Sequence, residues 1–536
     1  MQAIAQDRVA QQLIEQGCIS AQMVAYAQAV QVASRKSMAD TLLELRLVTE
    51  LELAQAISDA AGLPMLPLNF SDLNASALGE VPYAFAQKFQ VLPLRKVDGV
   101  LWLATATPDL AELGQRLARF TSLPLRWCVA PRGALARSIE SFYHFVQRPI
   151  EREIDDLLGM VRGSREFDAE RLVQLLITAG VQSRASDIHF VPSTLACMVM
   201  FRIDGVLQLR HVLPARAHPR VVSVIKIDAG MDIAETRKAQ DGRISFKLLS
   251  QSYDLRVSAV PASLGESVVI RILSTDGDVL PLAQLGFSLA QRELISRMLR
   301  QPQGIVLATG PTGSGKTTTL YAALRTLNAL ERNVMTIEDP VEYVVPLFRQ
   351  VSVNDKAGYG FVSAMRSFLR QDPDVMLVGE VRDAESASMA VRAAQTGHLV
   401  PATLHTNSAV SAVVRLRDLG VATYLVSSSL LGVIAQRLLR KLCEHCRTPD
   451  PLVAGRYLPV GCPRCAQTGY FGRIAVGEVL LISNPMRSAI EAGAGVHDLH
   501  ALAVREGMVD LAASALELVD AGVTDLAEMR RVIGDL

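Results

Sequence analysis

The chain has 536 residues, of which 50% are hydrophobic and 20% are charged, an ordinary globular composition that excludes a largely disordered protein. At about 100–200 residues per domain, three to five domains are expected. Lys plus Arg number 54, as do Asp plus Glu, so net charge gives no general attraction to nucleic acid or to an anionic membrane.

The first residues lack the apolar core of a signal peptide, and no run of about 18 uninterrupted apolar residues occurs. We therefore expect a cytoplasmic protein without a membrane-spanning helix. Three of the seven cysteines stand alone in the sequence and are expected to be buried thiols: Cys18, Cys128 and Cys197.

The predicted elements begin with a helical domain over residues 1–62. It contains a faint internal repeat, because segments 13–20 and 42–49 each end an amphipathic helix in a turn, after which Ser or Thr caps the next helix. The domain is followed by proline and asparagine residues that break the helical pattern.

Residues 63–147 predict a small α/β domain, and the charged stretch 148–169, which contains two glycines, predicts a linker. One helix of the small domain is expected to begin at a Thr107 cap with Pro108 in its first turn. The other expected elements are strands at 91–94, 101–104 and 125–129 and a helix at 133–145.

Residues 170–285 predict a second α/β domain, in which Asp204-Gly205 is a hairpin signal. Strand and helix signals then alternate over residues 286–440 and predict a parallel sheet. A Cys- and Pro-rich insert is expected over residues 441–472, and a mostly helical region over residues 473–536.

A phosphate-loop motif, G-x-x-x-x-G-K-[ST], lies between a predicted strand and a predicted helix, the context that the motif requires. The glycines let backbone N–H groups surround phosphate oxygens. Lys316 is expected to reach the β and γ phosphates of ATP, and Thr317 is expected to hold Mg²⁺. The alternative is a glycine-rich turn with a chance lysine. The expected nucleotide-binding residues are Gly310, Pro311, Thr312, Gly313, Ser314, Gly315, Lys316, Thr317 and Thr318.

A buried strand predicted at 375–378 is followed by Gly379 and Glu380. In ordinary phosphate-loop enzymes an Asp stands directly after this strand, whereas here the acid comes one residue later. Glu380 is a candidate general base for the attacking water, and the alternative is a solvated loop acid. Asp374, at the other end of the strand, is expected to be structural.

Several motifs resemble those of the secretion ATPases that drive type II secretion and type IV pilus assembly. The stretch 369–383, L-R-Q-D-P-D-V-M-L-V-G-E-V-R-D, resembles the family signature, 337–343 its Asp box, and 396–398 with 403–407 its His box. The resemblance implies a RecA-like ATPase core preceded by a PAS-like α/β domain, with a helical N-terminal docking domain. Segments 186–189, 202–205 and 240–243 resemble the domain in front of the core.

Three acids follow a predicted strand at 334–337, and carboxylates there suit the ordering of Mg²⁺ and water: Glu338, Asp339 and Glu342. The alternative is an acidic loop. His398 and His405 flank a short apolar run, and either could sense the γ phosphate, although a lone His is more often structural.

Arginines are expected to stabilise charge on the transferred phosphoryl group. Arg256 and Arg271 resemble family arginines that approach the nucleotide from the domain before the core. Arg366 and Arg370 lie four residues apart on one predicted helix face. For each arginine the alternative is a surface ion pair.

Two C-x-x-C pairs are separated by 15 residues, the spacing of a structural zinc site with four thiolate ligands: Cys443, Cys446, Cys462 and Cys465. Disulfides are the alternative, which a reducing cytoplasm disfavours. The resembled family often carries such an insert in its secretion and pilus-extension members.

The helical N-terminal region resembles a domain that binds cyclic di-GMP in some members through a pattern beginning R-L-G. Here residues 8–10 and 37–39 lack that glycine, so we do not expect messenger binding and favour docking to a membrane-associated partner.

The combined hypothesis is a homohexameric ATPase that uses ATP, Mg²⁺ and structural Zn²⁺ and drives assembly of pili or secretion pseudopili. It is expected to associate peripherally with the inner membrane through a platform protein and a membrane-associated assembly protein. The alternatives are a pilus-retraction ATPase, a zinc-containing nucleic-acid motor and a nucleotide-gated scaffold. The absence of a basic stripe with aromatic residues disfavours nucleic acid.

Overall fold

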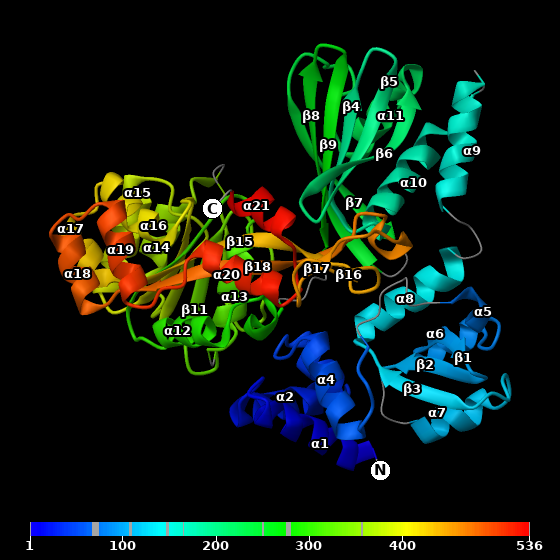
Figure 1. Ribbon diagram of the computed structural model, residues 1–536, viewed down its shortest axis with the longest axis horizontal. Helices are drawn as coiled ribbons and strands as arrows, with labels where there is room; N and C mark the ends of the chain where they lie inside the picture. Colours follow the sequence, from blue (N-terminus) through cyan, green and yellow to red (C-terminus); the bar gives the residue numbers. More distant parts are fainter. Residues whose placement is uncertain are drawn as a thin grey trace. The chain divides into compact units, whose positions relative to one another are not determined.

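The computed structural model describes residues 2–66, 74–106, 110–145, 150–163, 166–248, 251–274, 280–327, 329–354 and 357–534 (Figure 1). The chain divides into two compact units, one formed by Met1–Ala5 and Leu53–Gly277 and the other by Gln6–Glu52 and Asp278–Leu536. Within the described ranges, no helix is both long and apolar enough to cross a membrane. Thr107 and Pro108 lie outside the described residues.

The N-terminal segment is helical, as the sequence predicts. Its helices are α1 (Gln2–Glu15), α2 (Ala21–Ser34), α3 (Met38–Glu44) and α4 (Glu50–Ala61). The expected caps of the internal repeat are confirmed: the Ser20 hydroxyl accepts the Met23 N–H at 3.2 Å, and the Thr49 hydroxyl accepts the Glu52 N–H at 3.1 Å. Each cap satisfies a helix N–H that would otherwise have no partner.

Residues 74–106 and 110–145 include a three-stranded sheet in the order β1-β2-β3, whose buried apolar side chains pack with those of the helices. Alternation of strand and helix patterns predicts this arrangement correctly. The strands are β1 (Val91–Val97), β2 (Val100–Thr105) and β3 (Leu125–Val129), and the helices are α5 (Ala75–Leu78), α6 (Tyr83–Phe89), α7 (Leu110–Leu117) and α8 (Arg132–Phe145).

The same unit contains a six-stranded antiparallel sheet in the order β6-β5-β4-β9-β8-β7. Its strands are β4 (Ala185–Pro192), β5 (Ala196–Ile203), β6 (Val206–Pro214), β7 (Gln240–Leu248), β8 (Gln251–Ala262) and β9 (Gly265–Ser274). Helices α10 (Ala169–Gln182) and α11 (His218–Asp228) share a hydrophobic core with it.

The predicted linker at 148–169 differs from the structure. It contains helix α9 (Ile150–Arg162), and Ile154, Leu158 and Val161 on one face of that helix are buried in the core of the six-stranded sheet. These apolar residues recur at helical spacing, but the acids and the two glycines around them obscure the pattern.

The second unit is built on a seven-stranded sheet in the order β12-β11-β13-β14-β10-β15-β18. The strands run parallel, as predicted, except for β18, which pairs antiparallel with β15. They are β10 (Gly304–Thr309), β11 (Val334–Glu338), β12 (Arg349–Ser352), β13 (Val375–Val378), β14 (Leu399–Leu404), β15 (Leu430–Leu442) and β18 (Tyr470–Leu481).

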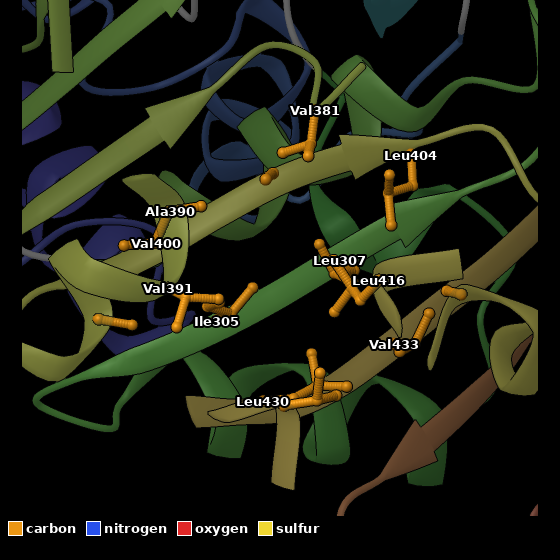
Figure 2. Close-up of a cluster of buried hydrophobic side chains, with 14 of the residues drawn as sticks. Ile305, Leu307, Val381, Ala390, Val391, Val400, Leu404, Leu416, Leu430 and Val433 are labelled. Carbon is orange, nitrogen blue, oxygen red and sulfur yellow. The ribbon is translucent and has the colours of Figure 1, made fainter. Parts of the chain in front are cut away.

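Alternate residues of the central strand β10 face two helical layers. Ile305 and Leu307 pack with α15 and α16, as Figure 2 shows, whereas Val306 and Ala308 belong to the core that contains α12 and α13. The first layer comprises α14 (Phe361–Phe368), α15 (Ala384–Gln395), α16 (Ala409–Asp418), α17 (Thr423–Ser429), α18 (Asn484–Glu491) and α19 (Val496–Arg505); the second comprises α12 (Leu289–Leu299) and α13 (Lys316–Leu324).

The sheet extends beyond the predicted limit at residue 440. The region predicted to be helical from 473 begins with β18, which returns along β15, so that the cysteine-rich insert is the tip of a long hairpin. The tip contains β16 (Thr448–Pro449) and β17 (Tyr457–Leu458). The last helices, α20 (Leu511–Asp520) and α21 (Leu526–Ile533), pack on this hairpin.

Pro401 lies inside β14, a central strand with neighbours on both sides. Its pairing with β10 is continuous, whereas only Leu399 and Ala402 are paired with β13. Leu399 donates its N–H to Asp374 on the β13 side at 3.0 Å, and Pro401, two residues later, has no N–H to donate there. The proline therefore interrupts one ladder and leaves the ladder beside the phosphate loop intact.

Candidate ATP-binding and hydrolysis site

The phosphate loop connects the end of β10 to the start of α13, as the motif predicts. Gly310, Gly313 and Gly315 have φ angles of 147°, 77° and 87°, which L side chains rarely adopt. A Cβ atom on Gly310 would lie 2.5 Å from the Gln436 carbonyl oxygen and 2.6 Å from Ser314 Oγ. The glycines thus allow a tight loop that leads into the N-terminus of α13, where backbone N–H groups favour anions.

Lys316 lies at the first position of α13 with only 8% of its surface exposed. Its Nζ donates to the carbonyl oxygens of Gly310 at 2.9 Å and of Pro311 at 3.1 Å. Burial lowers the pKa of Lys316, while the Glu380 charge acts in the opposite direction. The cation is therefore held within the loop itself.

Two buried oxygen atoms next to the loop have no hydrogen-bond partner among the described residues: Ser314 Oγ and Gln436 Oε1. Buried polar atoms are normally paired. The glycine conformations, the buried Lys316 and the helix N-terminus together fit a bound nucleotide phosphate. Thr317 follows Lys316 on α13, half-buried, and supplies the hydroxyl suited to Mg²⁺.

Glu380 follows β13 at the same edge of the sheet. Its Oε1 lies 3.1 Å from His405 Nε2, and its Oε2 accepts a hydrogen bond from Arg382 Nε at 2.7 Å. A cavity of about 350 Å³ beside it is lined in part by Phe361, Arg366 and Arg382. The carboxylate is oriented from both sides and remains 22% exposed.

Glycine precedes Glu380 because the backbone is crowded there. A Cβ atom on Gly379 would lie 3.0 Å from the Ile337 carbonyl oxygen and 3.1 Å from Glu338 Cα. The Gly379 N–H also donates to the Ile337 carbonyl at 2.8 Å. An Asp at this position would press against β11, so the acid is displaced by one residue.

The three acids of the Asp box occupy different environments. Glu338 is 3% exposed and accepts hydrogen bonds from the Tyr321 and Thr336 hydroxyls, and burial raises its pKa. Asp339 Oδ2 lies 3.6 Å from the Arg382 guanidinium, and Glu342 is exposed. Tyr321 lies one helical turn after Thr317, so Glu338 contacts the loop helix through Tyr321. The buried Glu338 therefore does not fit the acidic-loop alternative, and a role in ordering Mg²⁺ or water stays a prediction.

The two histidines lie at opposite edges of the sheet. His405 follows β14 and contacts Glu380, whereas His398 precedes β14 and bonds through Nδ1 to the Ala393 carbonyl at 2.9 Å. Seven residue steps at 3.3 Å separate them by about 23 Å. The structure therefore does not bring His398 to the phosphate loop, and the structural alternative fits it.

We expect His405→Ala to lower kcat by about 10- to 100-fold, because a hydrogen bond to a charged group contributes about 1.5–3 kcal/mol. His398→Ala is the matched control and is expected to leave kcat within about twofold, since its imidazole bonds to Ala393 and Thr396 near the end of α15. Steady-state phosphate release measures both. Equal losses in the two variants would contradict this distinction.

Arg256 and Arg271 are opposite one another on β8 and β9, and Arg243 on β7 is opposite Arg256. Like charges directly opposite each other destabilise a sheet. Arg271 Nε is paired with Asp187 Oδ1 at 3.0 Å, and its side chain is 59% exposed. Arg256 Nε lies 4.0 Å from Asp254 Oδ2, so Arg256 and Arg271 both have an acidic neighbour. The three arginines form a row across adjacent strands, and the ion-pair alternative stays open for them.

The other two arginine candidates fit the ion-pair alternative. Arg366 pairs with Glu385 at 3.0 Å, both side chains being more than 60% exposed. Arg370 donates to the Arg366 carbonyl oxygen at 3.1 Å. Both lie on or directly after α14, so they are better explained as surface residues than as phosphate ligands.

The two C-x-x-C pairs meet at the hairpin tip. All four Sγ atoms lie within 4.8 Å of one another, and the closest pairs are 3.7–3.8 Å apart. A tetrahedral site with Zn–S bonds of about 2.3 Å has sulfur separations of about 3.8 Å. The four are free cysteines. Their geometry fits zinc, and the disulfide alternative is not formed.

Backbone N–H groups support these sulfur atoms as they do in metal thiolate sites. Cys446 Sγ accepts from Gly461 at 3.3 Å, and Cys465 Sγ accepts from Cys462 and Gly469 at 3.2 Å. Burial by itself would raise the pKa of the Cys465 thiol, but these N–H groups and the neighbouring thiols bring it to about 7. Cys465 therefore loses its proton more readily than an ordinary cysteine.

Sequence reasoning missed Gln436 and Arg437 of β15. The fully buried Gln436 side chain donates to the Ser314 carbonyl oxygen at 2.7 Å, and Arg437 bonds to Asn407. In the sequence, these two residues stand out only as a glutamine and an arginine within an apolar strand. The pairing of β15 with β10 is needed to show that Gln436 lies beside the phosphate loop.

Comparisons with known proteins agree with this architecture. Residues 165–531 match the family described as Type II/IV secretion system protein, and residues 61–148 match the MshEN domain. The Type II secretion system protein HxcR of Pseudomonas aeruginosa is 46% identical over 384 residues, covering 72% of this chain and 80% of that protein.

A second relative matches nearly the whole chain. The Type IV pilus assembly ATPase PilB of Acinetobacter baylyi is 34% identical over 557 residues, 98% of this chain and 96% of that protein. The X-ray structure of the Legionella pneumophila ATPase DotB superposes with a TM-score of 0.52 at 22% identity over 67% of this chain and 94% of that one, which supports the fold alone. The chain belongs to the type II/IV secretion system protein family and is one of its ATPases.

Proposed function

We propose that this ATPase works as a Mg²⁺-dependent homohexamer that powers the assembly of type IV pili or of type II secretion pseudopili. The single observation that carries the proposal is the Glu380 carboxylate, held by His405 and Arg382 at the sheet edge that carries the phosphate loop. Relatives named for secretion and for pilus assembly match the chain.

In this proposal the parallel sheet of the second unit is a RecA-like core, and the six-stranded sheet is a PAS-like domain before it. The loop N–H groups and Lys316 bind the β and γ phosphates of ATP, and Thr317 and Asp339 are placed to hold or order Mg²⁺ and its water. When bound, Mg²⁺ neutralises charge on the β and γ phosphates. Glu380 polarises the attacking water, and His405 and Arg382 keep its carboxylate in orientation.

The arginine row of Arg243, Arg256 and Arg271 supplies positive charge to a phosphate, in the same subunit or in a neighbour. Support comes from the register, which sets the three arginines opposite one another although like charges on adjacent strands are destabilising. Asp187 and Asp254 offset part of that cost. Glu342 has a solvent-exposed side chain and suits outer-shell water ordering better than direct metal binding.

The four cysteines hold a structural Zn²⁺ at the tip of the β15–β18 hairpin. We place the protein in the cytoplasm, attached peripherally to the inner membrane through a platform protein and an assembly protein, with its N-terminal domains as the docking region. The tetracysteine tip favours extension or secretion over retraction, because the resembled retraction ATPases lack it.

A strain that carries Lys316→Ala tests the cellular role. We expect it to lose surface pili, or secreted proteins, by at least tenfold, because the phosphate loop no longer holds ATP. Electron microscopy of pili and a measurement of the secreted protein fraction distinguish the two machines. An increase in surface pili would instead indicate retraction, and unchanged pili and secretion would contradict the proposal.

A further inference from the structure

The loop that follows β14 is tied to the β15–β18 hairpin by two charged side chains. Arg437 on β15 donates to the Asn407 carbonyl oxygen at 3.0 Å and to Asn407 Oδ1 at 3.4 Å. Glu478 on β18 accepts the Ala409 N–H, the first of α16, at 2.6 Å. We refer to Arg437 and Glu478 as the hairpin brace.

The register of the hairpin explains why these side chains act together. Glu478 is opposite Ala435 in the antiparallel pair, and Arg437, two residues from Ala435, faces the same side of the sheet. Gln436 faces the other side and bonds to the phosphate loop at Ser314. One short stretch of β15 therefore holds the phosphate loop on one face and the loop after β14 on the other.

Arg437 is an unusual cation for a structural position. Its guanidinium is half-buried and bonds to neutral oxygens alone, those of Gln436 and Asn407, within the part of the chain that the structure describes. The Arg437 charge helps to lower the pKa of Lys316. Burial lowers the pKa of Arg437, and the Glu478 charge acts in the opposite direction. Two neighbouring cations are costly unless the site uses them.

The braced loop carries His405, which contacts Glu380. Asn407, the residue that Arg437 holds, lies two positions after His405, and Thr406 between them bonds through its Oγ1 to Thr309 Oγ1 at the end of β10 at 2.8 Å. Loss of the Arg437 bonds would remove the contacts that hold Asn407 on one side of Thr406, whereas the Thr406 N–H and hydroxyl would keep their bonds to Thr309. We expect the resulting shift to reach His405, on the other side of Thr406, which orients the Glu380 carboxylate. A small displacement of such a positioning group is enough to slow an enzyme strongly.

We propose that Arg437 is a positioning residue for ATP hydrolysis, which acts through Asn407 to hold His405 against Glu380. The inference rests on the hydrolytic roles proposed above for Glu380 and His405. It assigns to the β15–β18 hairpin, whose tip carries the four cysteines, a direct mechanical connection to the site of hydrolysis.

The test compares Arg437→Gln with the wild type in the full-length protein. We expect kcat to fall at least tenfold while the Kd for a non-hydrolysable ATP analogue stays within threefold, because the phosphate loop keeps its own bonds. Arg437→Lys keeps the charge and one donor, and is expected to recover part of kcat. Arg415→Gln, an exposed arginine on α16, is the matched control and should leave both quantities unchanged.

A double-mutant cycle with His405→Ala identifies the route. If Arg437 acts through Asn407 on His405, Arg437→Gln should lower kcat by less than threefold when His405 has already been replaced by Ala. Equal costs in both backgrounds, a tenfold rise in Kd with kcat unchanged, or wild-type kcat in Arg437→Gln would each overturn the inference. A separate variant tests the role of Glu380 as the base: if that role is wrong, Glu380→Gln keeps its turnover. The double-mutant cycle of Arg437 and His405 does not use that variant, so its result can still be interpreted.

Discussion

Glu380→Gln is expected to lower ATP turnover at least a hundredfold while the Kd for ATP stays within about threefold. The amide has the shape of the carboxylate and can still accept a hydrogen bond from Arg382, but it has no charge with which to attract a proton from water. General-base catalysis contributes typically about 10²–10⁴-fold. Single-turnover hydrolysis and equilibrium binding of a fluorescent ATP analogue measure the two quantities.

Lys316→Ala is the contrasting variant. The Lys316 ammonium lies inside the phosphate loop, so its removal should abolish turnover and weaken ATP binding at the same time. A Glu380→Gln protein that hydrolyses ATP at more than a tenth of the wild-type rate would exclude Glu380 as the base. A Glu380→Gln protein that fails to bind ATP would show instead that the carboxylate supports the loop.

The sequence predicts the parts of the site that are contiguous in the chain. Strand, phosphate loop and helix are consecutive, so their roles follow from local geometry, and the position of Glu380 after β13 follows from the rule that parallel strands present function at their carboxyl ends. Gln436 is 122 residues from Ser314 in the phosphate loop, and Arg437 is 30 residues from Asn407 in the loop after β14. Only the order β14-β10-β15 brings each of them to the loop that it supports.

Direction along a strand explains the difference between the two histidines. Both flank the same apolar run, and the sequence alone treats them alike, yet one precedes β14 and the other follows it. Glu338 illustrates a second limit. It is the last residue of β11, and its carboxylate accepts a hydrogen bond from Tyr321 of α13, a contact that local sequence does not specify.

Long-range pairing also explains the misplaced boundaries. The pattern at 470–481 was obscured by the cysteine-rich insert before it, although β18 is an ordinary strand that needs β15 as its partner. Helix α9 lies in a segment whose charges and glycines suggest a linker, and its apolar face becomes evident only where it is buried against the six-stranded sheet.

We expect the hairpin tip to depend on the proposed zinc ion for its structure. Between Cys443 and Cys465 the ordered elements are two strands of two residues each and one short turn of helix. The buried cluster of the tip comprises Cys443, Cys462 and Cys465, with Cys446 and Phe471 against it. So few apolar contacts cannot offset the entropy of ordering about 20 residues, whereas structural zinc contributes about 10–16 kcal/mol in zinc-finger peptides at neutral pH.

Cys462→Ser is therefore expected to lose at least nine-tenths of the bound zinc and to expose the tip to protease between residues 443 and 465, because three thiolates no longer close the tetrahedral site. Metal analysis of the purified protein and mapping of cleavage sites provide the measurement. Cys18→Ser, which removes a thiol outside the cluster, is the matched control and should retain wild-type zinc. Full zinc content in Cys462→Ser, or a chelator-treated protein that resists cleavage at the tip, would contradict a structural zinc site.

Arg437 and Glu478, the hairpin brace, lie on the same two strands but outside the tip. Cleavage of the tip should therefore slow hydrolysis less than Arg437→Gln does.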